Sequence, residues 1–534
     1  MRKGEFMNDP IVHELADKRT AETQQFRSQV GHISRHSGTL FAGTIFTAAL
    51  GYVFKIYLAR VLGAEALGIY ALGLTLMGFL GVFNSLGLPE SAVRFASVYR
   101  ANRKFEKLRA LLFWGGAILL VSNVFFAAIF LSAGGFVARR FYHSAALPHY
   151  LPWFVALMML GALSVFYSRI LAGYNAVGPR TIITNFIGSP ATMLLAVLFL
   201  SMGWGLSGYL LAQVLSAALV IGLILVVVWK RTPDDARIFT RLPAFPEREV
   251  LLFSVTAVAV LLLEFLMAQM DKIALGFYLG ARSVGIYSVA AAVVAYESMV
   301  LSSVNQVFSP IIADLHFRGD NVMLSRLYKA LTKWVFGVTV PLAIVVMVYA
   351  RPIMRMFGHD FESGWPILII GTVGQLVNCG VGSVALLLYM SGQQMRLLRV
   401  QIAMAGVMLV ANVALIPVWG IVGAAVAAAI TNAGINAWNF LNVRKVMGLS
   451  PFSRSFARLS VPALGSVALA LIVSRQQSWF RHDWLAIGVA FVAIYATFAG
   501  LVAALGLDAD DRMIAGAIWD RIRQTVPNLS GIQS

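Results

Sequence analysis

The chain alternates long apolar runs with short polar segments. A helix needs roughly 20 mostly apolar residues to cross a bilayer. Fourteen windows meet this requirement, at 40–60, 66–89, 110–132, 150–172, 181–201, 207–229, 250–278, 284–312, 333–350, 366–390, 398–417, 420–442, 459–474 and 483–505. The runs are too long, and alternate too little, for the strands of a membrane β-barrel. The pattern predicts an all-α integral membrane protein with about fourteen transmembrane helices.

Composition excludes several classes of function. The 534 residues are 59% hydrophobic and 12% charged, which is far from the balance of a water-soluble protein. The segments outside the predicted helices are too short for a soluble catalytic domain. The sequence contains no GxxxxGK[ST], HExxH or CxxC motif, so ATP hydrolysis and zinc chemistry are not expected. We expect neither an enzyme nor a bound cofactor or metal.

The placement of charge predicts the orientation in the membrane. A net charge of +18 would suggest nucleic-acid binding in a soluble chain, but most of the 42 Lys and Arg residues fall in alternate loops, with the richest at 93–109, 229–248 and 316–333. Cytoplasmic loops carry such an excess of positive charge. We predict a multi-pass protein of a bacterial inner (cytoplasmic) membrane, with both termini in the cytoplasm and no nucleic-acid partner.

The sequence also repeats itself. Residues 55–70 (KIYLARVLGAEALGIY) match residues 272–287 (KIALGFYLGARSVGIY) at nine of sixteen positions without a gap. The matched pairs include Lys55/Lys272, Gly63/Gly280, Gly68/Gly285 and Tyr70/Tyr287. Six predicted helices separate the copies, and an even number returns the chain to the same side of the membrane. The halves should therefore be parallel and related by a pseudo-two-fold axis along the membrane normal, as in transporters with parallel repeats.

This repeat defines the predicted organisation. It consists of a polar cytoplasmic segment at 1–38, a first six-helix bundle at 39–230, a cytoplasmic linker at 231–248, a second six-helix bundle at 249–443, two further helices at 444–506 and a cytoplasmic tail at 507–534. Substrate sites of repeat-based transporters lie at the interface of the repeats. The cleft between the two bundles is the predicted binding site.

Residues 62–97 (LGAEALGIYALGLTLMGFLGVFNSLGLPESAVRFAS), together with the two parallel bundles, resemble the polysaccharide-exporter branch of the multidrug/oligosaccharidyl-lipid/polysaccharide flippase superfamily, which includes O-antigen repeat-unit flippases. The resemblance covers roughly residues 38–505. It implies alternating-access transport of undecaprenyl-pyrophosphate-linked oligosaccharides through a cationic cavity. It also implies a role in O-antigen, capsule or exopolysaccharide biosynthesis, with a polysaccharide polymerase and a chain-length regulator as candidate partners besides membrane lipids.

Three basic residues inside predicted helices are candidate substrate-binding residues. Lys55 and Lys272 occupy equivalent positions near the outer ends of their helices, and Arg169 lies near the inner end of the fourth. Charges within a span are costly and are commonly functional. Facing the cleft, all three would attract an anionic substrate such as a pyrophosphate or an acidic sugar. The alternative is that their long side chains reach the membrane surface and leave the charge in water.

Two carboxylates, Glu264 and Asp271, are the candidate ion-coupling residues. Both fall in the seventh predicted helix, seven residues apart and therefore on one face. Buried carboxylates can bind and release a proton or sodium ion during transport. The alternative is a structural pairing, for example with Lys272. Among the spans we count three basic and these two acidic residues.

Aromatic side chains can stack on sugar rings. Candidates in or near cleft-forming helices are Tyr70, Tyr167, Tyr174, Tyr287 and Tyr296, of which the repeat favours the pair Tyr70 and Tyr287. The alternative is that tyrosines populate the membrane interface.

Three other functions fit parts of the pattern. A multidrug or organic-cation exporter would share the architecture but should have a net acidic cleft, and a lipid II flippase would differ mainly in its cargo. A membrane-embedded polysaccharide polymerase would share the substrate, but it would need larger loops outside the membrane than the sequence provides.

Overall fold

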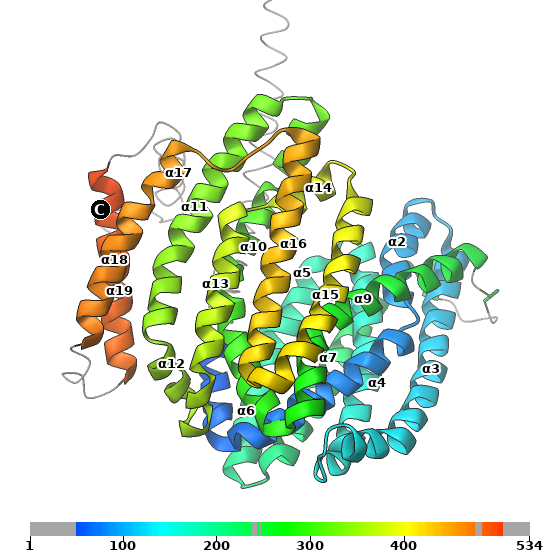
Figure 1. The fold of residues 1–534 in the computed structure, drawn as a ribbon. Helices are drawn as coiled ribbons and strands as arrows, with labels where there is room; N and C mark the ends of the chain where they lie inside the picture. The colour runs from blue at the N-terminus through cyan, green and yellow to red at the C-terminus, as the bar shows by residue number, and fades with distance from the viewer. Residues whose placement is uncertain (1–49, 238–242, 246, 476–482, 506–534) are drawn as a thin grey trace, which may run out of the picture.

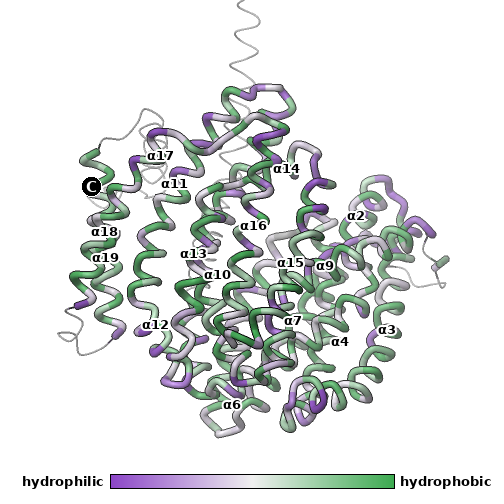
Figure 2. Tube along the Cα trace, viewed as in Figure 1, coloured by the Kyte–Doolittle hydropathy of each residue, from purple (hydrophilic) through white to green (hydrophobic). Residues whose placement is uncertain are grey.

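The computed structural model describes residues 50–237, 243–245, 247–475 and 483–505, and within these ranges the regular structure is entirely helical (Figure 1). The predicted all-α architecture is confirmed. Thirteen helices of the described part are long and apolar enough to cross a membrane. Hydrophilic residues gather at the helix ends, and hydrophobic residues lie between them (Figure 2). The predicted terminal segments 1–38 and 507–534 lie outside the described residues.

The first bundle begins with a helix at Leu50–Asn84. It continues with α2 (Leu88–Ala101), α3 (Phe105–Arg140), α4 (Leu147–Gly173), α5 (Val177–Thr181), the π-helix η1 (Ile182–Gly188), α6 (Ser189–Ser201), α7 (Gly205–Arg231) and the short α8 (Asp234–Arg237). Prolines stand in the first turns of α2, α4 and α6, where a missing backbone N–H costs nothing.

The second bundle contains α9 (Arg248–Leu279), α10 (Ala281–Phe317), α11 (Asn321–Val348), α12 (Ala350–Phe357), the 3₁₀ helix η2 (His359–Gly364), α13 (Trp365–Val381), α14 (Val384–Met390), α15 (Gln394–Trp419) and α16 (Ile421–Met447). Three more helices follow, α17 (Arg454–Arg458), α18 (Ser460–Arg475) and α19 (Asp483–Ala504). The last two pack on each other and on α11, at the left edge of Figure 1.

Two equivalent glycines separate the first two helices of each half. Gly280 has a φ of +79° and divides α9 from α10, and Gly63 has a φ of +77°. L-residues with a side chain rarely adopt this backbone conformation. The described helical range Leu50–Asn84 is nevertheless continuous and covers parts of two predicted spans, 40–60 and 66–89. Because this range counts as one helix, the described residues contain thirteen candidate spans where fourteen were predicted.

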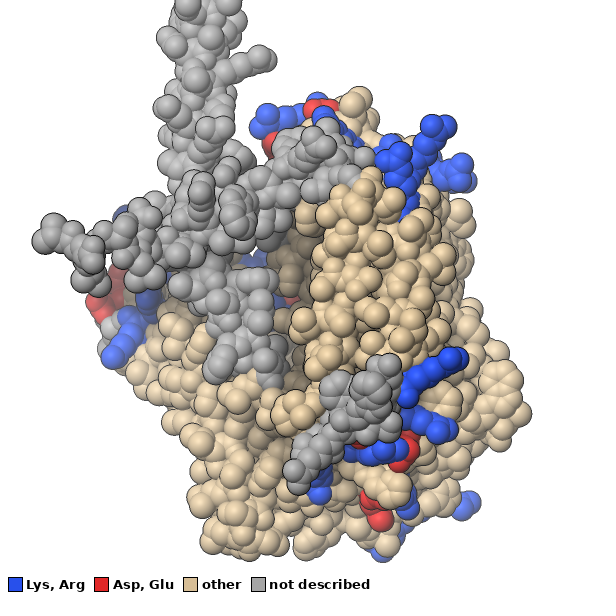
Figure 3. All heavy atoms as spheres, turned by 90° about the vertical axis from the view of Figure 1, so that its left-hand side faces the viewer, with Lys and Arg blue, Asp and Glu red and all other residues tan. Residues whose placement is uncertain are grey.

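The helix ends define two sides of the molecule. We call the side that carries the polar segments 101–105, 231–237 and 317–321 the basic end, and the side that carries Gly63, Gly280 and η2 the opposite end. The basic end is uppermost in Figures 1 to 3. In Figure 3 the surface is hollowed near its centre, and Lys and Arg lie along the upper edge and also on the lower half of this face.

One hydrophobic core is shared by the two bundles at the opposite end. It joins Leu58 and Leu72 of the first described helix to Leu275 of α9 and Val284 of α10. Burial of such apolar side chains at helix–helix contacts holds the bundles together there. This shared core places the pseudo-symmetric turns of the two halves side by side.

Two separate cores lie towards the basic end. The first bundle contributes a cluster that includes Leu111, Phe166 and Ile224. The second contributes a cluster that includes Leu324 and Val443. The bundles thus share one core at the opposite end and have separate cores towards the basic end, except that Val250 of α9 belongs to the first bundle's cluster. We call the hollow in Figure 3 the cleft.

Candidate functional site

The repeated glycines bring the two bundles into backbone contact at the opposite end. A Cβ atom on Gly68 would lie 1.7 Å from the carbonyl oxygen of Ala281, and one on Gly285 would lie 1.9 Å from that of Ala64. Ala64 and Ala281 occupy equivalent positions in the repeat, so the contact is close to two-fold symmetric. Since only a hydrogen fits at either position, the duplication preserves a tight helix crossing.

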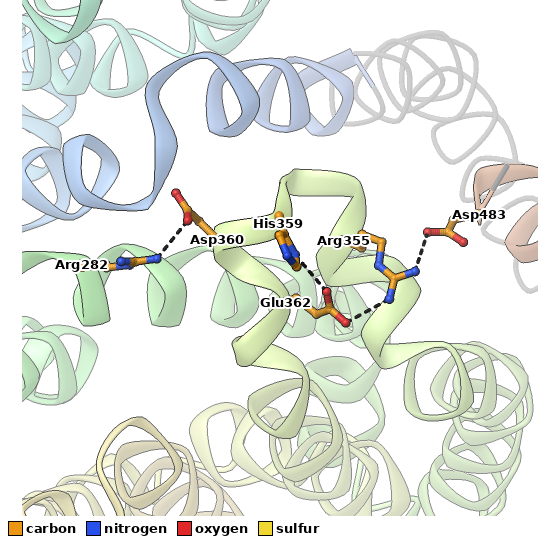
Figure 4. A network of polar contacts seen from close by, with 6 residues as sticks. All are labelled: Arg282, Arg355, His359, Asp360, Glu362 and Asp483. Atoms are coloured by element: carbon orange, nitrogen blue, oxygen red, sulfur yellow. Dashed lines mark hydrogen bonds and ion pairs between the residues drawn. The ribbon is translucent and has the colours of Figure 1, made fainter.

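Polar contacts accompany this crossing. Arg60 Nε donates to the carbonyl oxygen of Met356 at 2.7 Å, across the two bundles. Within the second half, the pairs Arg282–Asp360 (2.9 Å) and Arg355–Glu362 (3.0 Å) tie η2 to α10 and α12, as Figure 4 shows. His359–Glu362 (3.2 Å) lies within η2, and Arg355–Asp483 (3.8 Å) joins α12 to α19. Ion pairs as accessible to water as these contribute little to stability.

Lys55 lies at the contact between the bundles. Its side chain is exposed, and Nζ lies 5.5 Å from the centroid of the Tyr296 ring on α10. Tyr52, one turn earlier, packs edge-on against the same ring with centroids 5.4 Å apart. A cation and two aromatic rings therefore form one surface with components from both bundles.

Lys272 has a different environment, although the repeat makes it equivalent to Lys55. Its Nζ donates to Gln269 Oε1 at 2.9 Å. The same oxygen lies 3.5 Å from the Thr75 hydroxyl of the first bundle. Lys272 is half-buried, whereas Lys55 is exposed. The pseudo-symmetry of the sequence thus does not extend to the contacts of the two lysines.

The repeated tyrosines also have different partners. Tyr70 accepts a hydrogen bond of 2.6 Å from Gln213 Nε2 on α7 and packs against the ring of Tyr209. Tyr287 is buried and donates its hydroxyl to Asp271 Oδ2 on α9. Both rings are engaged in contacts between helices in this conformation, so stacking on a sugar would require them to move.

The two predicted coupling carboxylates differ in burial. Glu264 is exposed, and Asp271 is buried. Besides the Tyr287 hydroxyl, Asp271 accepts a hydrogen bond of 2.9 Å from the backbone N–H of Lys272. The structure therefore brings together two of the sequence-predicted residues, Asp271 and Tyr287, and leaves Glu264 apart from them.

Arg169 on α4 forms an ion pair with Glu90 on α2, with Nη2 2.8 Å from Oε1. The two side chains are 39% and 35% exposed, so the pair is neither buried nor fully in water. Because the pair lies towards the basic end, Arg169 is near the opening of the cleft and already has a neutralising partner.

Our count of acidic residues in the spans missed Glu297. It lies within the predicted helix 284–312 and within α10, and it is only 1% exposed. Its Oε1 accepts a hydrogen bond of 2.7 Å from the Thr372 hydroxyl of α13. The signal was available in the sequence as an acidic residue inside an apolar window. With Asp483, the first residue of the window 483–505, the predicted spans contain four carboxylates.

A polar cluster at the basic end ties α9 to the first bundle. Glu247, immediately before α9, accepts hydrogen bonds from the Lys107 ammonium of α3 and from the Tyr99 hydroxyl of α2. These bonds, the one from Lys107 above all, lower the pKa of Glu247. Deeper along α9, the hydroxyls of Ser254 and Ser91 lie 2.5 Å apart. Thus α9, which the sequence assigns to the second bundle, begins on the first.

Among the described residues, His, Cys, Asp and Glu side chains form no group of three that could hold a metal ion. The buried carboxyl groups of Asp271 and Glu297 lie on different helices, α9 and α10, and each accepts a hydrogen bond from a hydroxyl group.

The sequence matches the family model described as "Polysaccharide biosynthesis protein" over residues 33–316, which is slightly more than half of the chain. No curated protein matches the sequence.

Several solved structures have a similar fold. The lipid II flippase MurJ in an inward closed conformation aligns with a TM-score of 0.68 at 13% identity, covering 86% of this chain and 98% of that one. An inward-facing multidrug resistance MATE family transporter of the MOP superfamily aligns with a TM-score of 0.60 at 16% identity, covering 74% and 94%. A MOP superfamily transporter from Pyrococcus furiosus aligns with a TM-score of 0.54 at 15% identity, covering 77% and 94%. At these identities the similarity establishes the fold.

Proposed function

Because this chain belongs to the polysaccharide biosynthesis protein family, we propose that it flips undecaprenyl-pyrophosphate-linked oligosaccharide repeat units across the bacterial inner membrane. The proposed cargo serves O-antigen, capsule or exopolysaccharide synthesis. A polysaccharide polymerase and a chain-length regulator would receive the flipped unit. The basic end would face the cytoplasm, in agreement with the positive charge of its loops.

The observation that carries this proposal is the arrangement of the cores. The bundles share one core at the opposite end and have separate cores at the basic end. Alternating access also requires a second conformation. In it, the bundles would pack together at the basic end and separate at the opposite end. The contacts that must break for this include the apolar packing of the shared core, the Gly68–Gly285 crossing, the Arg60–Met356 hydrogen bond and the Lys55–Tyr296 contact.

The charges support an anionic, glycan-bearing cargo. Lys55 supplies an exposed cation beside the rings of Tyr52 and Tyr296, and this combination suits a phosphate attached to a sugar. Low-dielectric walls strengthen the field of such a charge. We propose that Lys55 binds the pyrophosphate or an acidic sugar, with Lys272, Arg169, Tyr70 and Tyr287 as further substrate-binding residues that become available as the helices move.

A proton or sodium gradient is the proposed energy source, in exchange for the cargo. Asp271 and Glu264 are the coupling candidates within α9. Asp271 is buried with a hydroxyl partner, so its charge would depend on whether α9 and α10 stay together. Glu264 is exposed and would have to bind its ion in the open cleft.

Two alternatives share the fold. The similarity to the lipid II flippase MurJ covers nearly all of that protein, which makes lipid II the nearest alternative cargo. The similarity to a multidrug transporter makes an organic cation the other.

The deciding experiment reconstitutes the full-length protein into vesicles that contain a polyprenyl-pyrophosphate-linked oligosaccharide. An impermeant glycan-oxidising reagent then reports the fraction of lipid facing outward. We expect oxidation of the inner-leaflet pool with wild-type protein, and protection of that pool in empty vesicles. Protection of the oligosaccharide lipid together with flipping of lipid II would move the assignment to lipid II, and transport of an organic cation alone would favour an exporter.

A further inference from the structure

Glu297 combines deep burial with incomplete hydrogen bonding. The side chain is 1% exposed. Its Oε1 accepts the Thr372 hydroxyl, whereas Oε2 is buried without a hydrogen-bond partner. Among the described residues, its hydrogen bonds and ion pairs include no Lys, Arg or His. An ionised carboxylate in such a place would be an uncompensated buried charge, which proteins avoid by neutralising the group.

The groups around Glu297 come from four helices. On α13 lie Thr372, Gln375 and the buried thiol of Cys379, and on α19 lies the Tyr495 phenol; both Cys379 and Tyr495 interact electrostatically with Glu297. The thiol in turn interacts with Thr339 of α11. One turn along α10, Leu301 packs with Val335 and Cys379 in a small apolar cluster. None of these described groups is cationic, so none of them can compensate a negative charge.

Side-chain amides extend from this place through the second bundle. Asn432 Nδ2 of α16 lies 3.4 Å from Gln375 Oε1, and Asn436 Nδ2 lies 3.0 Å from Asn432 Oδ1. One turn further towards the basic end, Asn439 is buried with an unpartnered Oδ1. Polar residues are rare inside apolar bundles and mark ion and proton pathways.

We propose that Glu297 is a membrane-buried proton-binding site, protonated in the conformation described above. Binding forms an O–H bond at Oε2 with a proton taken from water and leaves a neutral carboxylic acid. Release breaks that bond, returns the proton to water and leaves a carboxylate. A proton suits this place better than a metal cation, because the described residues include no group of three His, Cys, Asp or Glu side chains that could hold a metal ion.

The position on α10 connects this site to the cleft. Tyr296 and Glu297 are neighbours about 100° apart around the helix, so one contacts Lys55 of the first bundle and the other Thr372 inside the second. A movement of α10 that breaks the Lys55–Tyr296 contact would also shift Glu297 against α13. Only the consequence, that a pH gradient drives transport, rests on the proposed function. The protonation of Glu297 can be measured without any cargo.

The test uses full-length protein in lipid nanodiscs and infrared spectroscopy, which detects the C=O band of a protonated carboxyl. We expect wild type at neutral pH to show a band that Glu297→Gln lacks and that Asp314→Asn retains. Asp314 is a matched control, because it is an acid on the same helix with an exposed side chain and an Arg318 partner. Thr372→Val should shift the band, and Thr372→Ser should restore it.

The second measurement is vesicle flipping with and without a pH gradient. We expect Glu297→Gln to flip equally under both conditions, while wild type and Asp314→Asn respond to the gradient. An unchanged infrared band in Glu297→Gln, or a band that sodium abolishes at constant pH, would overturn the proton site. If Glu297→Gln does not fold, Glu297→Asp takes its place. A C=O band at the wild-type position in Glu297→Asp, together with a wild-type response of flipping to the pH gradient, would likewise overturn the proposal. Absence of flipping by wild type would refute only the proposed function, since the infrared result stands alone.

Discussion

Gly68 and Gly285 are equivalent residues of the two sequence repeats. At the opposite end of the molecule, Gly68 packs against the second repeat at Ala281, and Gly285 packs against the first repeat at Ala64. Each leaves space for no more than a hydrogen beside the backbone of the other half, at Ala281 and Ala64 respectively. The duplication is therefore also a contact, in which each copy of the repeat packs on the other. This contact, with the shared core around it, holds the molecule closed at one end.

A methyl group at this crossing should shift the conformational equilibrium. We expect Gly68→Ala and Gly285→Ala to disfavour the closed opposite end by about 1–3 kcal/mol, the usual cost of overpacking, which changes the equilibrium roughly five- to 150-fold. The readout is disulfide formation between cysteines at positions 60 and 356 in a Cys379→Ala background, which should fall. Gly81→Ala is the matched control, because nothing lies within 4 Å of a Cβ at this position of the same helix. Equal crosslinking in all three variants would show that the Gly68–Gly285 crossing does not hold the opposite end closed.

The Lys55–Tyr296 contact should contribute to both closure and cargo binding. A cation over an aromatic ring is worth about 0.5–2 kcal/mol. We expect Lys55→Ala to reduce flipping of the pyrophosphate lipid severalfold, Lys55→Arg to retain most of it, and Lys329→Ala, which removes an exposed lysine on α11, to have no effect. A double-mutant cycle with Tyr296→Leu measures the coupling. Additive losses would mean that the two side chains act independently.

Arg169 poses a choice between substrate binding and structure. As a half-exposed pair with Glu90, it should contribute only about 0–1 kcal/mol to the free energy of unfolding. If Arg169 binds the cargo, Arg169→Ala will lower flipping while Glu90→Gln leaves it intact or raises it. If the pair is structural, both variants will unfold at lower temperature and the exchange Arg169→Glu/Glu90→Arg will restore stability. Thermal unfolding and flipping of the same preparations separate the two outcomes.

Asp271 and Tyr287 should act together in ion coupling. Tyr287→Phe removes the hydroxyl that donates a hydrogen bond to Asp271. Leaving a buried acceptor without its donor destabilises the folded state by about 1–3 kcal/mol. We expect Asp271→Asn to abolish the response of flipping to a proton or sodium gradient, and Tyr287→Phe to weaken it. Glu264→Gln tests the second coupling candidate in the same assay. A gradient response preserved in both Asp271→Asn and Glu264→Gln would exclude α9 as the coupling helix.

Stability at the basic end should depend on pH through Glu247. Lys107 and Tyr99 lower its pKa below the ordinary 4.5, so the folded state favours the ionised form. The resulting stabilisation is fully present above pH 4.5 and is lost as the pH falls through the lowered pKa. We expect wild type to exceed Glu247→Gln in thermal stability at neutral pH, and the difference to shrink on acidification. A difference that grows at low pH would contradict this assignment.

The sequence by itself determined the membrane architecture. Hydrophobic windows are a local property of the chain, and a bilayer requires each spanning segment to satisfy its own backbone hydrogen bonds as a helix. The windows therefore predicted helices that the structure confirms, and the repeat at Lys55 and Lys272 predicted two parallel halves. Gly63 and Gly280, which the repeat matches, both have a positive φ, because this requirement is local to the backbone.

The tertiary structure alone decided which polar residues meet. Lys55 and Lys272 are equivalent in sequence, yet one lies over Tyr296 and the other bonds Gln269. Tyr287 bonds the buried Asp271, and no pattern within one helix reveals such a partner. Burial of a polar group depends on helices that are distant along the chain, and a repeat preserves backbone geometry while its contacts diverge. For the same reason the pairing of Gly68 with the other copy of its own motif became visible only when the two halves were packed together.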